Sequence, residues 1–146
     1  MHSLPIELNW MILKYVDEPT KVVTKFVCKS WGNISSTDPK IIMKYAAENG
    51  YLSVLQWAKA NGCPWDKRTC ADAARNGHLA VLQWARANDC PWNEWTCASA
   101  ARNGHLAVLQ WARTNGCPWD ELTCTYAAQN GHLAVLQWAK ANGCPQ

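Results

Sequence analysis

The chain has 146 residues, of which 49% are hydrophobic and ten are tryptophan, and its formal net charge is +3. This length suits one compact domain or a small module joined to a repeat array. The modest charge, with no run of basic residues, argues against nucleic-acid binding, and no stretch of about 18 apolar residues is present to span a membrane. The N-terminus lacks the basic and apolar regions of a secretory signal, so the eight cysteines are expected to be reduced thiols in a cytoplasmic or nuclear protein.

The first 36 residues do not repeat, and they predict two short amphipathic helices. Residues 4–16 begin with a proline in the first turn, and residues 21–31 follow an Asp-Glu-Pro-Thr turn. The apolar residues at helical spacing are Leu8, Ile12, Leu13 and Val16 in the first segment and Val22, Val23, Phe26 and Val27 in the second. Two helices of this size have too little core to be stable alone, so the adjoining repeats, a partner or both must cover them.

This segment resembles the F-box family. The matching points are Leu4-Pro5, Glu7-Leu8, Ile12-Leu13, and Val27-Cys28 followed by Trp31, at a similar overall distance. The resemblance implies docking onto a Skp-family adaptor, which brings a target protein to a cullin-RING ubiquitin ligase. It assigns the adaptor contact to Leu4, Pro5, Leu8, Ile12, Val27 and Trp31. The alternative is that residues 1–36 form only an N-terminal helical cap on the repeats.

From residue 37 a 27-residue unit recurs four times. Its fixed points include Gly50, Gly77, Gly104 and Gly131, and also Trp57, Trp84, Trp111 and Trp138. A fixed period in this range predicts a solenoid of stacked supersecondary units. The expected units are 37–63, 64–90, 91–117 and 118–144. The predicted fold is therefore all-α, with a short helical module at residues 1–36 and an α-solenoid of helix-turn-helix repeats at residues 37–146.

Each unit predicts two short helices. The first follows a Pro-Trp pair and an Asp or Asn suited to be the N-cap, and it stops at Asn-Gly. The expected N-caps are Asp66, Asn93 and Asp120, with Asp38-Pro39 giving the same signal in the first unit. The second helix, residues 78–87 in the second unit, should bury Leu79, Val81, Leu82 and Ala85. It ends at Asn-Gly-Cys-Pro, where glycine takes the left-handed conformation. In the second unit Asp89 replaces this glycine, which should lower the stability by about 1 kcal/mol.

The repeats resemble the ankyrin family. Residues 100–117, Ala-Ala-Arg-Asn-Gly-His-Leu-Ala-Val-Leu-Gln-Trp-Ala-Arg-Thr-Asn-Gly-Cys, follow the family line A-A-x-x-G-H-x-x-V-V-x-x-L-L-x-x-G-A. Two features depart from it. The period is shorter than the family's period of about 33, so the β-hairpin must be reduced to the Cys-Pro-Trp loop. The Thr-Pro-Leu-His tetrad is replaced by Arg68-Thr69-Cys70-Ala71. The resemblance implies a stack of helix pairs without hairpin contacts.

The repeated histidines, cysteines and tryptophans are interpreted as packing residues. His78, His105 and His132 open the second helices, and their rings should bond to a neighbouring turn. Tyr51 holds this place in the first unit, which a metal ligand would not tolerate. The cysteines lack a Cys-x2-Cys pair, so buried free thiols are expected ahead of zinc ligands or disulfides. Each tryptophan can bury about 150–250 Å² between layers, the alternative being a ladder for stacking bases or sugars. No cofactor or metal is expected.

The positions that vary between units lie mainly on the first helices, four and three residues apart, and so share one helical face. They are Ile41, Tyr45 and Glu48; Arg68, Asp72 and Arg75; Trp95, Ser99 and Arg102; and Leu122, Tyr126 and Gln129. A constant scaffold with one varied stripe is typical of a repeat-protein binding surface, the alternative being drift on a solvated face. The predicted target-binding residues are Tyr45, Arg68, Asp72, Trp95, Ser99, Leu122 and Tyr126.

Taken together, these patterns predict a non-catalytic adaptor, because no nucleophile, base and orienting group converge. Its expected partners are a Skp-family adaptor and a protein target. The combination of both resemblances is similar to proteins of large DNA viruses of the pandoravirus type, which implies the host cytoplasm or nucleus. The alternatives are a plain binding solenoid that sequesters or scaffolds a partner and, more remotely, a Cys/His metal protein. Because no polar capping repeat follows the fourth unit, Ala127, Val135 and Trp138 are expected to leave a partly open face unless the chain is a fragment.

Overall fold

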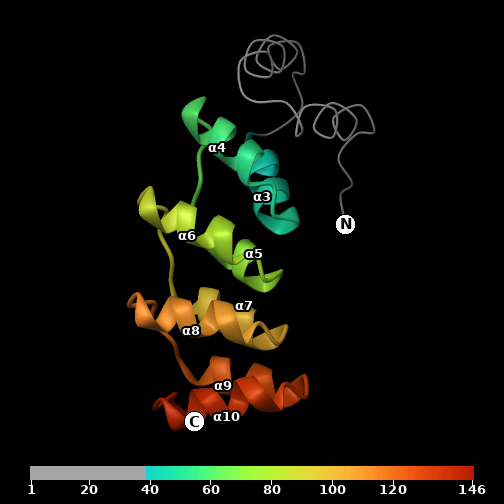
Figure 1. Cartoon of the computed structure of the whole chain (residues 1–146), viewed down its shortest axis with the longest axis vertical. Coiled ribbons are helices and arrows are strands. Elements are labelled where there is room, and N and C mark those ends of the chain that lie inside the picture. The colour runs from blue at the N-terminus through green and yellow to red at the C-terminus, as the bar shows by residue number, and fades with distance from the viewer. Residues whose placement is uncertain (1–38) are drawn as a thin grey trace.

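A computed structural model describes residues 39–146, which form eight α-helices and no strand. Their bounds, with the labels of Figure 1, are α3 (Pro39–Asn49), α4 (Leu52–Ala60), α5 (Lys67–Arg75), α6 (Leu79–Ala87), α7 (Glu94–Arg102), α8 (Leu106–Thr114), α9 (Glu121–Gln129) and α10 (Leu133–Ala141). The predicted helical solenoid is confirmed. The two helices predicted within residues 1–36 and the Asp38 cap lie outside the described residues.

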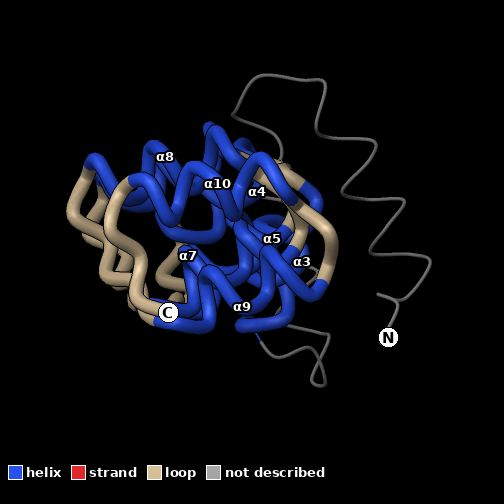
Figure 2. Tube along the Cα trace, turned by 90° about the horizontal axis from the view of Figure 1, so that it is seen from below, coloured by secondary structure: helices blue, strands red, loops and turns tan. Residues whose placement is uncertain are grey.

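The helices stack as antiparallel pairs along the long axis of the molecule (Figure 1). The first helices of the repeats (α3, α5, α7 and α9) form one layer, and the second helices (α4, α6, α8 and α10) form the other (Figure 2). Successive first helices pack directly on one another, from α3 to α5, α7 and α9. This arrangement aligns the variable residues of the four units on one side of the stack. No helix within residues 39–146 has the length and apolar content needed to cross a bilayer.

The N-termini of the first helices follow from their capping residues. The Asp66 carboxylate accepts a hydrogen bond from the Arg68 N–H (2.8 Å), and the Asp120 carboxylate accepts one from the Leu122 N–H (3.1 Å). Each bond satisfies one of the amides that a helix start leaves without a partner. Asn93 adopts the same extended backbone, but its side chain makes no cap hydrogen bond. The predicted cap at Asn93 is therefore wrong for the side chain.

The second helices end as the Asn-Gly-Cys-Pro pattern predicts, with one residue in the left-handed conformation. The φ angle at Gly116 is 82°, and at Asp89, which replaces the glycine, it is 64°. The next amide then turns back onto the helix, as in the 3.0 Å hydrogen bond from the Cys90 N–H to the Ala85 carbonyl. Asp89 thus adopts the same left-handed backbone conformation as the glycines of the other repeats, although its Cβ makes this conformation sterically unfavourable.

The core runs through the whole stack and consists of small and medium-sized side chains. The predicted inward residues Val81, Leu82 and Ala85 are buried, whereas Leu79 is half-buried. Alanines in the first helices are buried where successive repeats meet. Their small side chains allow α5 and α7 to approach closely. All seven cysteines among the described residues are buried and form no disulfide, as expected from the sequence.

The outer face of the fourth repeat differs from the prediction. Ala127 and Val135 are buried (0% and 2% exposed) rather than open, because they contribute to the cores formed with their own and the preceding repeat. The more exposed positions are Ala128 and Leu136, whose counterparts one repeat earlier are fully buried under the following helix pair, and Leu133, which is 65% exposed. Trp138 is half-buried, like the corresponding tryptophans of the other repeats.

Candidate protein-binding surface

The histidines set the spacing between successive repeats. The His78 Nε2 lies 2.9 Å from the Glu48 carbonyl, and the His132 Nε2 lies 3.1 Å from the Arg102 carbonyl. A carbonyl only accepts, so Nε2 carries the proton in both rings. The ring of His78 also lies against Gly50, where an added Cβ would approach its Nδ1 to 2.6 Å. The predicted bond to a neighbouring turn is confirmed for these two histidines.

The loop tryptophans fasten each repeat to the one before it. Trp65 makes an edge-to-face contact with Trp84 of its own repeat, with ring centroids 5.7 Å apart. On its other side the Nζ of Lys59, from the preceding repeat, lies 4.1 Å from the Trp65 ring centroid. The same arrangement recurs at Trp92 and at Trp119. Aromatic and cation–π contacts of this kind confirm the predicted packing role between layers.

In the second, third and fourth repeats two buried cysteines interact as thiols. Burial and hydrogen bonding to the Cys90 thiol raise the pKa of Cys70 far above its ordinary value, with the hydrogen bond the larger cause. Cys97 is held in the same way by Cys117. The Cys70 and Cys97 thiols therefore stay protonated and act as small apolar side chains. Within residues 39–146 no group of three or more His, Cys, Asp or Glu side chains is arranged to hold a metal ion.

The predicted target-binding residues lie on the first helices, where most are partly accessible. Arg68 and Trp95 are exposed, and Tyr45, Asp72, Ser99, Leu122 and Tyr126 are half-buried. Trp95 and Tyr126, from adjacent repeats, lie with ring centroids 6.5 Å apart. The guanidinium of Arg102 lies 5.5 Å from the Tyr126 ring centroid. Tyr45 instead packs on Tyr51 of its own repeat, at 5.8 Å.

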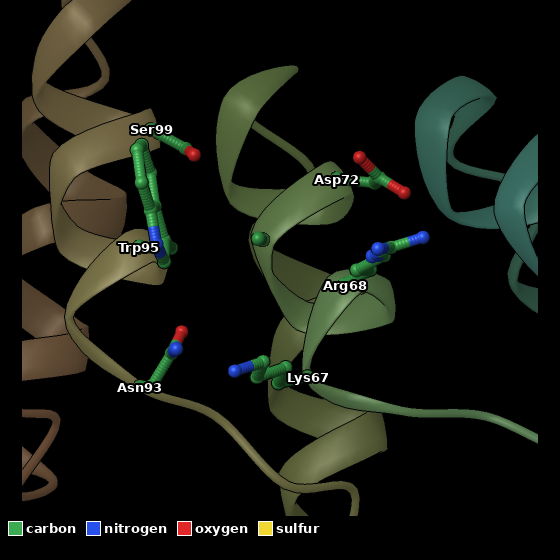
Figure 3. A pocket seen from close by; sticks show the side chains of 7 residues that line it. Lys67, Arg68, Asp72, Asn93, Trp95 and Ser99 are labelled. Carbon is green, nitrogen blue, oxygen red and sulfur yellow. The ribbon is translucent and has the colours of Figure 1, made fainter.

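An open hollow of about 390 Å³ lies between α5 and α7. Its lining residues are Lys67, Arg68, Ala71, Asp72, Asn93, Trp95 and Ser99. Four of these were predicted from the variable stripe, whereas Lys67 and Asn93 were not. Lys67 extends from the start of α5 toward Asn93 at the start of α7 (Figure 3). Residue spacing within one helix does not show that Lys67 of one repeat lies near Asn93 of the next. The asparagine at position 93, where the neighbouring repeats have aspartate, could have marked this position as different.

The electrostatics of the hollow favour an anionic ligand. Lys67 and Arg68 form no ion pair with any described residue. The Asp72 carboxyl is half-buried, and desolvation, with a smaller contribution from Glu48, raises its pKa to about 6. The Asn93 Oδ1 is buried and accepts no hydrogen bond from the described residues. The side of the hollow that faces α7 therefore combines the Lys67 amine, an exposed indole and an acceptor without a hydrogen bond, whereas Arg68 and Asp72 point toward α3 (Figure 3).

Comparison with known families identifies a domain in the N-terminal segment. Residues 1–42 match the family described as F-box domain, and the match extends past the predicted boundary at residue 36 into the first turn of α3. No curated protein matches the chain as a relative. The predicted adaptor-binding residues Leu4, Pro5, Leu8, Ile12, Val27 and Trp31 fall within the matched range but outside the described residues, so their role stays a prediction. The chain contains an F-box domain, a module that typically binds Skp-family adaptors and supports substrate recognition by SCF-type ubiquitin ligases, together with a helical repeat solenoid.

Proposed function

We propose that this protein is a substrate receptor that links a target protein to an SCF-type cullin-RING ubiquitin ligase. The F-box domain at residues 1–42 would bind the Skp-family adaptor, and the ankyrin-like repeats would bind the target. The observation that supports this most directly is the presence of both parts in one chain, with an accessible Trp95 on the repeat surface. A large exposed indole beside unpaired cations is typical of a protein-binding surface.

In this proposal the chain itself does not catalyse ubiquitin transfer. The chain would position the target, and the enzymes recruited by the adaptor would transfer ubiquitin. The contact with the adaptor would use Leu4, Pro5, Leu8, Ile12, Val27 and Trp31. Truncating a central apolar contact of this kind should weaken adaptor binding by about 1–3 kcal/mol. The resemblance to proteins of large DNA viruses supports the further proposal that the receptor acts in the cytoplasm or nucleus of an infected host cell.

Co-purification with a eukaryotic Skp-family adaptor tests this proposal. The wild-type chain should form a one-to-one complex, and a Pro5→Ala/Trp31→Ala variant with an unchanged far-UV circular dichroism spectrum should lose it. Trp95→Ala is the control, since its side chain lies on the repeats and its loss should leave adaptor binding intact. A folded wild-type chain that does not bind the adaptor would reject the receptor assignment and favour a plain binding solenoid.

A further inference from the structure

We propose that the hollow between α5 and α7 binds an extended peptide segment in which an acidic side chain stands next to an aromatic or large apolar one. This inference rests on the proposed function only in taking the segment to be part of the target. Binding of the peptide itself depends on the described repeats and not on the adaptor. With about 390 Å³, the hollow is at the small end of ligand pockets, which span roughly 300–1,000 Å³. It therefore suits one or two side chains of a peptide laid across the stack.

Charge selects the acidic side chain. The exposed cations Lys67 and Arg68 line the hollow without an ion-pair partner among residues 39–146. The Asp72 carboxyl, whose pKa desolvation raises to about 6, points toward α3 and away from Trp95 (Figure 3). Arg86 and Arg113, by contrast, stack on the loop tryptophans. A carboxylate of a ligand seated beside Trp95 would meet the Lys67 amine, which points to this side of α5, whereas Arg68 points toward α3 (Figure 3).

The wall of the hollow selects the apolar side chain. Trp95 is 46% exposed, yet its ring is braced by Tyr126, which in turn lies under the Arg102 guanidinium. An aromatic side chain held in place by its neighbours loses little conformational entropy when it binds. Indole faces and edges pair well with aromatic and aliphatic groups. The exposed area of Trp95 is thus a preorganised platform on the side of α5 to which Lys67 points (Figure 3).

The backbone of the ligand would use Asn93. At the equivalent position of the neighbouring repeats, the Asp66 and Asp120 carboxylates cap the following helix by accepting a hydrogen bond from its first turn. Asn93 does not, and its Oδ1 is left buried without a donor where it lines the hollow. A buried acceptor without a hydrogen bond is unfavourable, and an extended peptide presents free N–H groups. One such N–H would complete the hydrogen bonding of this side chain.

The test starts with selection of phage-displayed random nonapeptides on the immobilised full-length chain. The expected outcome is enrichment of Asp or Glu within two residues of Trp, Phe, Tyr or Leu. One enriched peptide, labelled with fluorescein, would then be measured by fluorescence anisotropy against variants. Lys67→Glu should raise its Kd about tenfold, Arg68→Glu should raise it less because its guanidinium points toward α3, and Trp95→Ala should raise it at least about tenfold. The Kd should also rise with salt concentration.

Two matched controls separate the site from general effects. Lys140→Glu changes the net charge by the same amount at an exposed position on α10, and Leu133→Ala removes a still more exposed apolar side chain from the same helix. Both should change the Kd less than about twofold. Basic or neutral consensus peptides, no enrichment at all, or equal effects of Lys67→Glu and Lys140→Glu would overturn the proposal. Adaptor binding is measured separately, so a chain that binds the adaptor but no acidic peptide rejects this inference alone, and the reverse result rejects the receptor function alone.

Discussion

Substituting alanine for Gly104 should destabilise the stack more than the same change at Gly131. Both glycines are left-handed, with φ of 76° and 72°. An alanine at either position therefore bears the same local cost, about 1–2 kcal/mol. At Gly104, however, the new Cβ would lie 2.6 Å from the Nδ1 of His132, whereas at Gly131 it would meet nothing within 4 Å.

The additional cost at Gly104 can be worked from the histidine that must move. Displacing the His132 ring breaks its 3.1 Å hydrogen bond to the Arg102 carbonyl, which contributes about 0.5–1.5 kcal/mol net, and repacking the contact adds about 1 kcal/mol. We therefore expect Gly104→Ala to lower the free energy of unfolding by about 2.5–4.5 kcal/mol and Gly131→Ala by about 1–2 kcal/mol.

Urea unfolding followed by circular dichroism and by tryptophan fluorescence measures both losses. A His132→Ala background supplies the double-mutant cycle, because without the ring the two glycine substitutions should cost the same. Equal losses in the wild-type background would refute the reasoning, and so would an extra loss at Gly104 that survives His132→Ala. Either result would mean that the histidine does not fix the distance between repeats.

Three further predictions concern single side chains. Asp89→Gly should stabilise the chain by about 0.5–1 kcal/mol, seen as a higher Tm, because φ there is 64°. The pKa of Asp72 is raised to about 6, so the folded state binds this proton more tightly than the unfolded state. The Asp72→Asn variant should therefore be more stable than the wild type near pH 8. As pH falls from about 7 to about 4, the free energy of unfolding of the wild type, measured by urea titration, should rise relative to that of the variant. Asn93→Asp should raise Tm by supplying the cap seen at Asp66, worth about 0.5–1 kcal/mol, yet weaken binding of the acidic peptide in the anisotropy assay.

The sequence predicts the features that depend on local geometry. The left-handed turn at Asp89, the caps at Asp66 and Asp120, and the buried Leu82 all follow from the residues within one repeat. The repeat period extends these assignments to the whole stack, since each unit can bury its apolar face only on its neighbours.

Most differences concern contacts between repeats; the exception is the Asn93 side chain, which does not cap α7. Whether Ala127 or Ala128 faces outward depends on the rotation of α9 on its neighbours, and the helical pattern alone allows either. The meeting of Lys67 with Asn93 depends on how far α7 is shifted along α5, which no spacing within one helix encodes. Tyr45 stays a predicted binding residue, and its ring packs on Tyr51 of its own repeat.

The most direct test of the account is whether one chain holds the adaptor and a target peptide at the same time. Sedimentation velocity would follow the fluorescein-labelled acidic peptide in a mixture of the full-length chain and a Skp-family adaptor. The peptide should sediment with the adaptor-containing complex. Pro5→Ala/Trp31→Ala should lose the adaptor and keep the peptide, and Trp95→Ala should do the opposite. Mutual exclusion of adaptor and peptide, or loss of both partners in either folded variant, would contradict a receptor with two separate binding surfaces.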